Sequence, residues 1–312
     1  MVIGTKEQTH PTGQTYTFAR HETFHLRDGW LFKGLAAVQA DEFALYARDA
    51  HHDLGIGLNM LKSLLYWLQA TNLVQAVPAK GGSRSPLRPT RLAKLVCAYD
   101  PYFEDLGTLW LLHIELAANC PMATFWYWAF NEFARHECTE EQLVHGVQHF
   151  LEAHEAPAFA VSSLHKDARC FLRTYVPWHS QGRPNPPEDT LDSPLIWLGL
   201  LRESAVPGHY TFQIGPHKNL PMWLFAYTLY RFKERTKPEE VVFSLEDLRW
   251  ASLSPGRLLC LDKRALFMYL EELEHQTSYA HLLHTAGLNI VTFDESIEAF
   301  DMLTAYYTGR RE

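Results

Sequence analysis

The stretch DEFALYARDAHHDLGIGLNMLKSLLYWLQATNLVQA, residues 41–76, carries two runs of apolar residues on either side of a glycine-containing turn. The first run goes from Phe43 to Ala50 and the second from Met60 to Leu68. Apolar residues that recur three and four positions apart indicate one face of a helix. Because Gly55 and Gly57 favour a tight turn between the runs, the stretch predicts two helices in helix-turn-helix order.

The residues after this stretch predict a hairpin that completes a winged helix. In PAKGGSRSPLRPTRLAKLV, Gly81 and Gly82 are placed to turn the chain between two short strands. In a winged helix the second helix would lie in the major groove of DNA, and the hairpin would reach the phosphate backbone. Leu58, Leu64 and Leu65 suit a protein partner better than DNA, so a protein contact stays open as the alternative. The candidate DNA contacts are Asn59, Lys62, Ser63 and Tyr66 on the helix and Lys80, Arg84 and Arg88 on the hairpin.

Charge is segregated along the chain, although the net charge of -8 hides this. Residues 54–99 contain no Asp or Glu, whereas residues 100–160 contain ten acids and the single base Arg135. A local basic block on an acidic protein suits phosphate binding, because affinity depends on the few phosphates that are contacted. A solvated loop with incidental charges is the alternative. The cations of the block are Lys62, Lys80, Arg84, Arg88, Arg91 and Lys94.

Composition narrows the class of protein. The hydrophobic fraction of 47% in 312 residues provides enough material for one or more packed cores. The five cysteines include no Cys-x-x-Cys pair, which argues against a zinc ribbon or a dense disulfide framework and favours a reducing compartment. The N-terminus lacks an apolar signal core, and no run of about 18 uncharged apolar residues follows. We expect a cytoplasmic protein with no membrane contact.

The fold that we expect is mainly α with short β hairpins, in which winged-helix-like units surround an aromatic helical core. The core is expected in LGTLWLLHIELAANCPMATFWYWAFNEFARH, because its large aromatic side chains can bury extensive apolar area. The proline-rich HSQGRPNPPEDTLDSP is the best linker candidate. After it, a capped helix, a Pro-Gly turn, a second helix and a terminal strand suggest another winged unit, which would bracket DNA or join two protomers as a homodimer. The predicted domains are 1–98, 99–180 and 181–312.

The segment FARHETFHLRDGWLFKG, residues 18–34, combines the residue types that phosphodiester hydrolysis needs. Metal-assisted cleavage uses carboxylates to hold a divalent ion and cations to stabilise charge in the transition state. Glu22 and Asp28 are candidate oxygen ligands, and His21 is a candidate ligand or general base. Arg20, Arg27 and Lys33 are candidate phosphate clamps. Alternatively, Glu22 pairs with Arg27 while Phe24 and Trp30 pack against the predicted winged helix.

Three further acids, Asp100, Glu104 and Asp105, precede an apolar helix. They would complete a magnesium or manganese site with Glu22 if the segments meet, but acids at this position also cap helices. Arg169 and Arg173 share a helix face that would meet phosphate or form salt bridges with the acidic middle. The chain lacks a phosphate-binding loop, a GxSxG elbow and a common restriction-nuclease core, so ATP hydrolysis and serine chemistry are not expected.

Seven motifs follow one another along the chain: ARHETFHLRDGWLFKG, LGIGLNMLKSLLYWL, YDPYFEDLGTLWLLHIELA, TFWYWAFNEF, KDARCFLRTYV, LDSPLIWLGLL and LSPGRLLCLD. In this order they resemble the family known as domain of unknown function 4007. The resemblance spans nearly the whole chain. It implies a bacterial defence system in which sulfur-transfer enzymes place phosphorothioates in the DNA backbone. A similar component of the single-stranded version of that system is understood to be a DNA nickase. This chain carries Leu58 and Leu64 where basic residues are expected, which shifts the predicted grip on DNA towards the wing.

The resemblance and the residues together predict a DNA-binding component that nicks DNA with a divalent metal, magnesium or manganese. Its expected partners are DNA and the sulfur-transfer proteins. A non-enzymatic adaptor that recruits those proteins through the acidic middle, or a transcriptional regulator, is the alternative. The predicted catalytic residues are Glu22, His21, Asp28, Lys33 and Asp100; the predicted metal ligands are Glu22, Asp100, Glu104 and Asp105; the predicted DNA contacts are Arg20, Arg27, Asn59, Lys62, Lys80, Arg84, Arg88, Arg91, Arg169 and Arg173.

Overall fold

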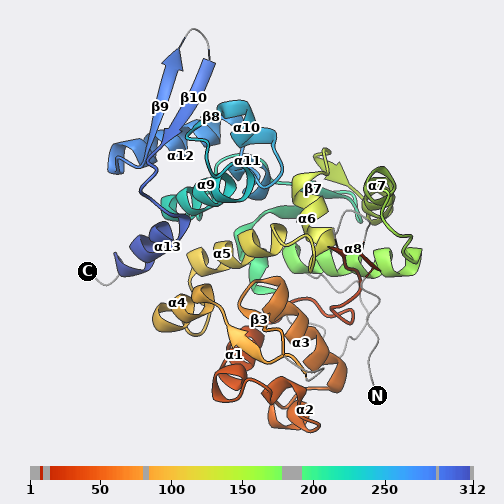
Figure 1. Cartoon of the computed structure of the whole chain (residues 1–312). Coiled ribbons are helices and arrows are strands. Elements are labelled where there is room, and N and C mark those ends of the chain that lie inside the picture. Colours follow the sequence, from red (N-terminus) through yellow and green to blue (C-terminus); the bar gives the residue numbers. More distant parts are fainter. Residues whose placement is uncertain (1–7, 10–14, 80–83, 178–191, 286–287, 310–312) are drawn as a thin grey trace. The chain divides into compact units, whose positions relative to one another are not determined.

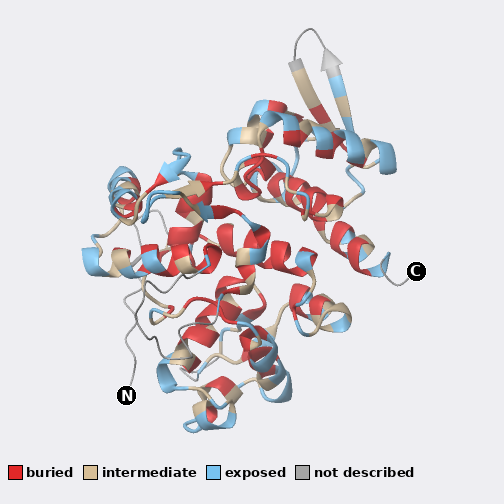
Figure 2. Cartoon of the chain, turned by 180° about the vertical axis from the view of Figure 1, so that it is seen from behind, coloured by how far each residue is buried: buried red, intermediate tan, exposed pale blue. Residues whose placement is uncertain are grey.

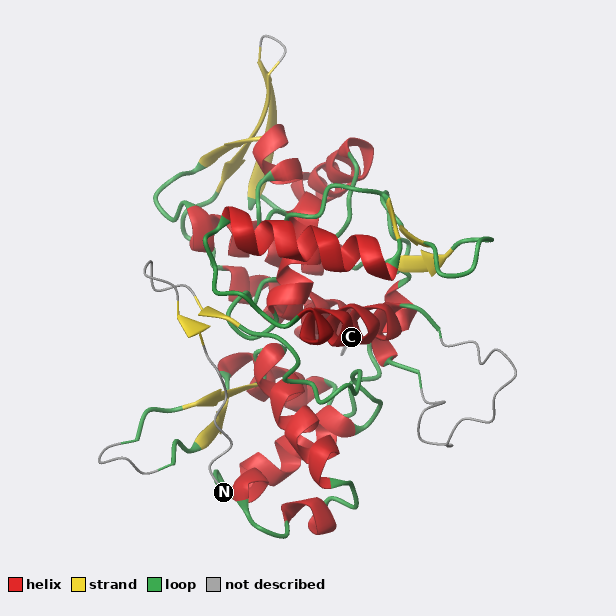
Figure 3. Ribbon diagram, turned by 90° about the vertical axis from the view of Figure 1, so that its right-hand side faces the viewer, coloured by secondary structure: helices red, strands yellow, loops and turns green. Residues whose placement is uncertain are grey.

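The computed structural model describes residues 8–9, 15–79, 84–177, 192–285 and 288–309. Lys80, Gly81 and Gly82 lie outside the described residues, as does most of the predicted linker. The chain is mainly helical with small antiparallel sheets and a cluster of aromatic side chains, which confirms the coarse prediction. Figure 3 shows the short strands at the margins of the helices. None of the described helices is long and apolar enough to span a bilayer.

The contacts divide the chain into two units. Unit 1 comprises Met1–Ala129 and Phe133–Thr211, and unit 2 comprises Phe130–Glu132 and Phe212–Glu312. This division differs from the three predicted domains, because residues 99–177 pack with the N-terminal residues and the segment after the predicted linker returns to unit 1. In that segment a 3-10 helix, η4 (Pro194–Leu198), packs on two helices of unit 1, α5 (Leu106–Ala117) and α8 (Val161–Tyr175). The strand β6 (Leu201–Glu203) joins a sheet there.

Unit 1 is built mostly from helices (Figure 1). Its helices are α1 (Trp30–Ala40), η1 (Ala44–Tyr46), α2 (Ala50–Asp53), α3 (Leu58–Ala70), α4 (Arg91–Tyr99), α5, most of α6 (Thr124–Asn131), α7 (Glu140–Ala153), α8 and η4. Its strands are β1 (Gln8–Thr9), β2 (Thr15–Tyr16), β3 (Val74–Ala76), β4 (Leu87–Pro89), β5 (Glu137–Cys138), β6 and β7 (Tyr210–Phe212). They form the sheets β1-β2, β3-β4 and β5-β7-β6.

The helix predicted over residues 43–50 is wrong. The chain instead forms the short elements η1 and α2, because Asp41 starts a turn by accepting the backbone N–H of Phe43 (2.9 Å) and Ala47 is extended. The helix before it, α1, was not predicted. Gly34 allows α1 to approach α3 closely, since a Cβ at Gly34 would lie 2.6 Å from Leu64 and 2.7 Å from Leu68.

The core of unit 1 is aromatic, as predicted. Trp67 of α3, Trp126 of α6 and Phe171 of α8 are each fully buried. The Trp67 and Trp126 rings meet edge to face with centroids 5.4 Å apart, and Trp126 and Phe171 meet at 6.2 Å. Such pairs add to the free energy of burial. Figure 2 shows buried residues along the inner sides of the helices. The ring contacts show that three segments far apart in sequence share one core.

Unit 2 combines five helices with one three-stranded sheet among its described residues. The helices are α9 (Met222–Thr236), α10 (Leu245–Trp250), α11 (Pro255–Leu258), α12 (Lys263–Gln276) and α13 (Ala299–Thr308). The strands are β8 (Val242–Ser244), β9 (Ala280–Thr285) and β10 (Leu288–Phe293), in the antiparallel order β8-β10-β9. The hairpin β9–β10 extends away from the helices of its unit (Figure 1). A hairpin and a final helix thus replace the single terminal strand that was predicted.

Candidate functional site

The turn at residues 19–23, inside the segment predicted to do chemistry, has a strained backbone. Ala19, Glu22 and Thr23 have φ angles of 58°, 49° and 69°. In this left-handed region the Cβ of an L-residue crowds the backbone, which costs on the order of 1 kcal/mol per residue. Such a conformation persists only where neighbouring groups hold it, so its contacts identify the supporting residues.

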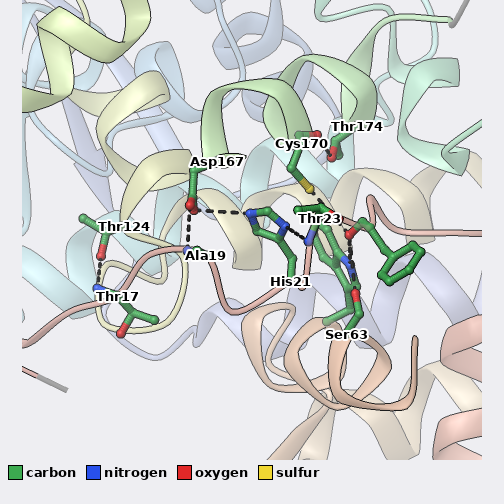
Figure 4. Close-up of polar contacts among 11 residues, drawn as sticks. Thr17, Ala19, His21, Thr23, Ser63, Thr124, Asp167, Cys170 and Thr174 are labelled. Carbon is green, nitrogen blue, oxygen red and sulfur yellow. Dashed lines mark hydrogen bonds and ion pairs between the residues drawn. The ribbon is translucent and has the colours of Figure 1, made fainter. Parts of the chain in front are cut away.

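Asp167 of α8 holds the start of this turn. Its Oδ2 accepts the backbone N–H of Ala19 at 2.6 Å, and its Oδ1 lies 3.5 Å from Nε2 of His21 (Figure 4). His21 is fully buried and Asp167 is 2% exposed. A buried carboxylate is stable only when it is paired or hydrogen-bonded, and Asp167 finds both partners on this one turn.

The carbonyl oxygen of Phe24 fixes the end of the turn. It lies within reach of three donors: the Ser63 hydroxyl at 3.4 Å, Nε1 of Trp67 at 3.1 Å and the Cys170 thiol at 3.5 Å. Two of these donors belong to α3 and one to α8. Helix α8 therefore holds the turn at both of its ends, and α3 adds two contacts at the second end.

The proton on His21 is fixed by its neighbours. Burial opposes a charged ring, whereas Cys170 and Asp167 together would raise the pKa of His21 to about 10. However, Cys170 acts as a negative partner only as a thiolate, and its Sγ donates to the Phe24 carbonyl as a thiol. The backbone N–H of Thr23 donates to Nδ1 at 3.1 Å, which requires a lone pair there. The geometry favours a neutral ring whose proton lies on Nε2 and faces Asp167.

Tyr66 of α3 completes the buried group. Its ring centroid lies 6.0 Å from that of His21. Burial, together with the charge of Asp167, raises the pKa of Tyr66 well above its usual value. Ser63 and Tyr66 are both buried on α3, so the expectation that these two side chains face DNA is wrong. Their side of the helix packs against the turn instead.

Sequence reasoning missed Asp167 and Cys170. In α8 the apolar residues Leu164, Ala168 and Phe171 mark the buried stripe, and Asp167 lies within it. A carboxylate on an apolar stripe signals a buried partner, but the partner lies 148 positions away at Ala19. The position of Asp167 on an apolar stripe could be read from the sequence, whereas its pairing with Ala19 is seen only in the structure.

At the surface, the turn brings together predicted site residues from two different segments. Nζ of Lys62 lies 3.6 Å from the Glu22 carboxylate and donates to the Asn59 side chain at 3.1 Å. Glu22 and Lys62 are half-exposed and Asn59 is exposed. The alternative pairing of Glu22 with Arg27 is not the one that forms here.

The other charged residues of this segment differ in how far their side chains are buried. Arg27 is buried, with its guanidinium carbon 5.2 Å from the Phe24 ring and 5.4 Å from the Trp30 ring. Arg20 is half-buried, while Asp28 and Lys33 are exposed. Oδ1 of Asp28 accepts the N–H of Gly29 at the start of α1. Arg27 therefore stabilises the segment from within, and Lys33 presents its charge to solvent.

The basic block forms a surface around the hairpin β3–β4 and helix α4. Arg84 and Arg88 are exposed on the hairpin side, and Arg91 and Lys94 are exposed on α4. Arg84 lies over the Tyr46 ring at 4.1 Å, and Arg88 pairs with Glu42 at 3.2 Å. We call Arg84, Arg88, Arg91 and Lys94 the hairpin cations.

The predicted pair Arg169 and Arg173 lies on α8, apart in sequence from this surface. Arg169 is exposed and binds both carboxylate oxygens of Glu140, at 2.9 and 3.1 Å, while Arg173 is half-buried. Glu140 also accepts from Nδ1 of His165 at 2.7 Å. For Arg169 the salt bridge to the acidic middle region is the arrangement that forms.

Comparison with known proteins identifies the family. The sequence model of the family described as "Protein of unknown function (DUF4007)" matches residues 18–307. The chain belongs to this family. A solved structure of magnesium ion-bound SspB is similar to it, with a TM-score of 0.84 and 30% identity over 98% of this chain and 90% of that chain. A second SspB structure has a TM-score of 0.83 and 28% identity over 98% and 91% of the two chains. No curated protein matches significantly.

In this member of the family, two of the four predicted metal ligands, Asp100 and Asp105, accept backbone N–H groups. The two carboxylate oxygens of Asp100 accept the N–H groups of Glu104 (3.0 Å) and Asp105 (3.1 Å). Asp105 caps α5 by accepting the N–H groups of Gly107 and Thr108. In the described part of the chain, no three His, Cys, Asp or Glu side chains are placed to hold one ion. At any place among the described residues, a Mg²⁺ ion would therefore need water or phosphate oxygens to complete its coordination.

Proposed function

We propose that this chain is the DNA-binding component of a bacterial DNA phosphorothioation system. Its likeness to SspB over nearly the whole chain supports the setting. The hairpin cations support the DNA contact and are the single observation that carries it. The second helix, α3, exposes Leu58 and Asn59 at its start but buries most of its length, so the proposed grip lies on the hairpin and α4.

The hairpin cations are arranged for phosphate contact. Arg91 and Lys94 are three positions apart on α4 and share a face, and Arg88 lies in the middle of β4, the strand that leads into that helix. Arg88 has a carboxylate partner in Glu42, but both side chains are well exposed, at 58% and 40%. Exposed ion pairs contribute about 1 kcal/mol or less, so a phosphate can replace Glu42 with little loss.

Removing these charges tests the proposal. In the variant Arg88→Ala/Arg91→Ala/Lys94→Ala, we expect binding to a 30-base-pair duplex to weaken roughly 30-fold, and the slope of log K against log salt to fall by about 2.7. Fluorescence anisotropy across a salt series measures both quantities. The matched control, Arg135→Ala/Lys166→Ala/Arg202→Ala, removes three exposed cations of unit 1 from other segments. Equal losses in both variants would contradict a localised site.

Within that setting we propose DNA nicking as the activity, with Glu22 as the residue to test first. Glu22 is half-exposed on the strained turn, whereas His21 is buried beneath it and would act by holding the turn. Asp28 and Lys33 are exposed near the start of α1 and remain candidates, and Asp100 is occupied by backbone N–H groups.

A nicking assay on supercoiled plasmid, combined with a gel shift, distinguishes catalysis from DNA binding. Incubation with magnesium, manganese or chelator should give open circles only with the metal, and Glu22→Ala should abolish nicking while gel shift shows DNA still bound. Lys62→Ala is the matched control, because it breaks the same 3.6 Å ion pair and leaves the carboxylate in place. If both variants nick like the wild type, Glu22 is only a surface partner of Lys62.

A non-enzymatic adaptor is the second candidate, and the exposed acids of the middle region favour it. Glu137, Glu141, Glu152 and Glu155 are all exposed on or beside α7. A sulfur-transfer protein with a basic face would complement them. DNA binding without nicking under any metal condition would make this the leading function, and selective binding of one promoter sequence would indicate a transcriptional regulator.

A further inference from the structure

We infer that unit 2 carries a second nucleic-acid-binding surface, separate in sequence from the hairpin cations. It consists of Trp250 with Arg249 and Arg257 around its indole ring, together with Lys263 and Arg264 at the start of α12. Its ligand is the phosphate backbone of a nucleic acid. This surface rests on the proposed function, because its ligand is again a nucleic acid, but the residues that bind it are different ones.

The centre of this surface is an exposed tryptophan that holds two arginines. Trp250 ends α10 and is 52% exposed. The guanidinium carbon of Arg249 lies 4.4 Å from its ring centroid and that of Arg257 lies 5.3 Å away. Nε of Arg257 also donates to the Trp250 carbonyl at 3.4 Å. Stacking on the indole restricts the arginine side chains, so less conformational entropy is lost when they bind phosphate.

Gly256 keeps Arg257 beside this ring. A Cβ at Gly256 would lie 2.4 Å from the carbonyl oxygen of Arg249, so α11 packs directly on the backbone of α10. A leucine or alanine there would push α11 away from Trp250. The close contact thus sets the positions of Arg249 and Arg257 relative to each other.

Two more cations follow along the chain. Lys263 and Arg264 are both exposed in the first turn of α12. Their neighbour Asp262 directs Oδ1 at the backbone N–H of Ala265, 2.7 Å away, and so caps the helix. The acids Glu271 and Glu272 lie two turns further along α12. Of the nearby carboxylates, Glu132 interacts electrostatically with Arg257.

The order of elements in unit 2 favours a nucleic acid over a protein as the ligand. Helix α9, strand β8, helices α10 to α12 and the hairpin β9–β10 follow one another in the order of a winged helix, and β8 pairs with β10 in the sheet. In that arrangement α12 is the helix that approaches the major groove, and the start of such a helix lies close to the DNA. Lys263 and Arg264 are at that start.

The test uses the full chain and the same duplex anisotropy assay. The variant Lys263→Ala/Arg264→Ala should weaken binding about tenfold and lower the salt slope by about 1.8, because two phosphate contacts are lost. The matched control is Lys218→Ala/Lys237→Ala, which removes two exposed cations elsewhere in unit 2 and should change neither quantity.

Trp250→Ala tests the stacking itself. Because the arginines keep their charge but lose their support, we expect about threefold weaker binding with an unchanged salt slope. Trp250→Phe should restore most of the affinity.

The outcomes separate this inference from the proposed function. If the hairpin-cation variant loses affinity while Lys263→Ala/Arg264→Ala and Trp250→Ala behave like the wild type, the second surface is overturned and the proposed function stands. If only the unit 2 variants lose affinity, the second surface stands and the hairpin site fails. Loss of the folded circular dichroism signal in Trp250→Ala would leave the Lys263→Ala/Arg264→Ala result as the deciding measurement, because both of those side chains are exposed.

Discussion

Asp167 is the residue on which the candidate site of unit 1 depends most. It connects α8 to a turn in which Ala19, Glu22 and Thr23 adopt left-handed backbone angles. The free energy that holds such a turn must come from contacts outside it. Glu22 reaches Lys62 at the surface only while the buried pair His21 and Asp167 holds the turn below. The position of Glu22 at the surface is thus coupled to Asp167, which is buried.

Substitutions at Asp167 should reveal this role. Asp167→Ala leaves Ala19 and His21 without their acceptor, and we expect the free energy of unfolding to fall by about 3 kcal/mol. Asp167→Asn offers one acceptor oxygen in place of two, so one contact is lost in either orientation of the amide; about 1.5 kcal/mol is expected.

Urea denaturation followed by circular dichroism measures these changes. The exposed Glu104→Ala is the control and should lie within about 0.5 kcal/mol of the wild type. An Asp167→Ala variant as stable as this control would show that the turn holds itself. A stable Asp167→Asn variant with weakened nicking would assign Asp167 a positioning role beyond stability.

At the scale of elements, the sequence predicted those helices whose own residues show a regular apolar pattern or a capping residue. The apolar run from Met60 to Leu68 forms α3, and the capped helix predicted after the linker is α10, where the Ser244 side chain accepts the N–H of Asp247. The helix predicted over residues 43–50 does not form, because Asp41 makes a competing turn. Helix α1 was missed because Gly34 weakens its helical signal, and the reason for that glycine lies in α3, 30 positions away.

Two glycines should therefore respond differently to the same substitution. At Gly34 a Cβ meets the ends of two leucine side chains, which can move, so Gly34→Ala should cost about 1 kcal/mol after the gain in helix propensity. At Gly256 the Cβ meets the Arg249 backbone at 2.4 Å, so Gly256→Ala should cost about 3 kcal/mol or more. Gly57→Ala, whose Cβ would meet only Met60 at 3.8 Å, is the control.

Thermal unfolding ranks the three variants. The order expected is Gly256→Ala least stable, then Gly34→Ala, then Gly57→Ala close to the wild type. If Gly256→Ala unfolded at the same temperature as Gly57→Ala, α11 could move away from α10 without loss of stability. In that case the arrangement of Arg249, Trp250 and Arg257 would not be rigid.

At the scale of the whole molecule, the sequence predicted the mainly helical class, the aromatic core and the family, because each rests on long or repeated signals. It did not predict the two-unit division or the pairing of Asp167 with Ala19. Both depend on contacts between residues more than 100 positions apart, and a single sequence does not show which distant residues pair with each other. The charge pattern did point to the hairpin cations, since exposed charges need no distant partner.

The reactivity of the cysteines depends on how tightly both units are packed. Cys120, Cys138, Cys170 and Cys260 are buried, Cys97 is half-buried, and all are free thiols. Burial raises the pKa of Cys138 and of Cys260 to about 12 and raises that of Cys97 as well. Because the thiolate is the reactive form, a raised pKa lowers the reactive fraction at pH 8. We expect Ellman's reagent to detect one slow thiol in the folded chain and all five in guanidinium. Cys97→Ser should abolish the native signal; two or more native thiols would show that a buried segment opens.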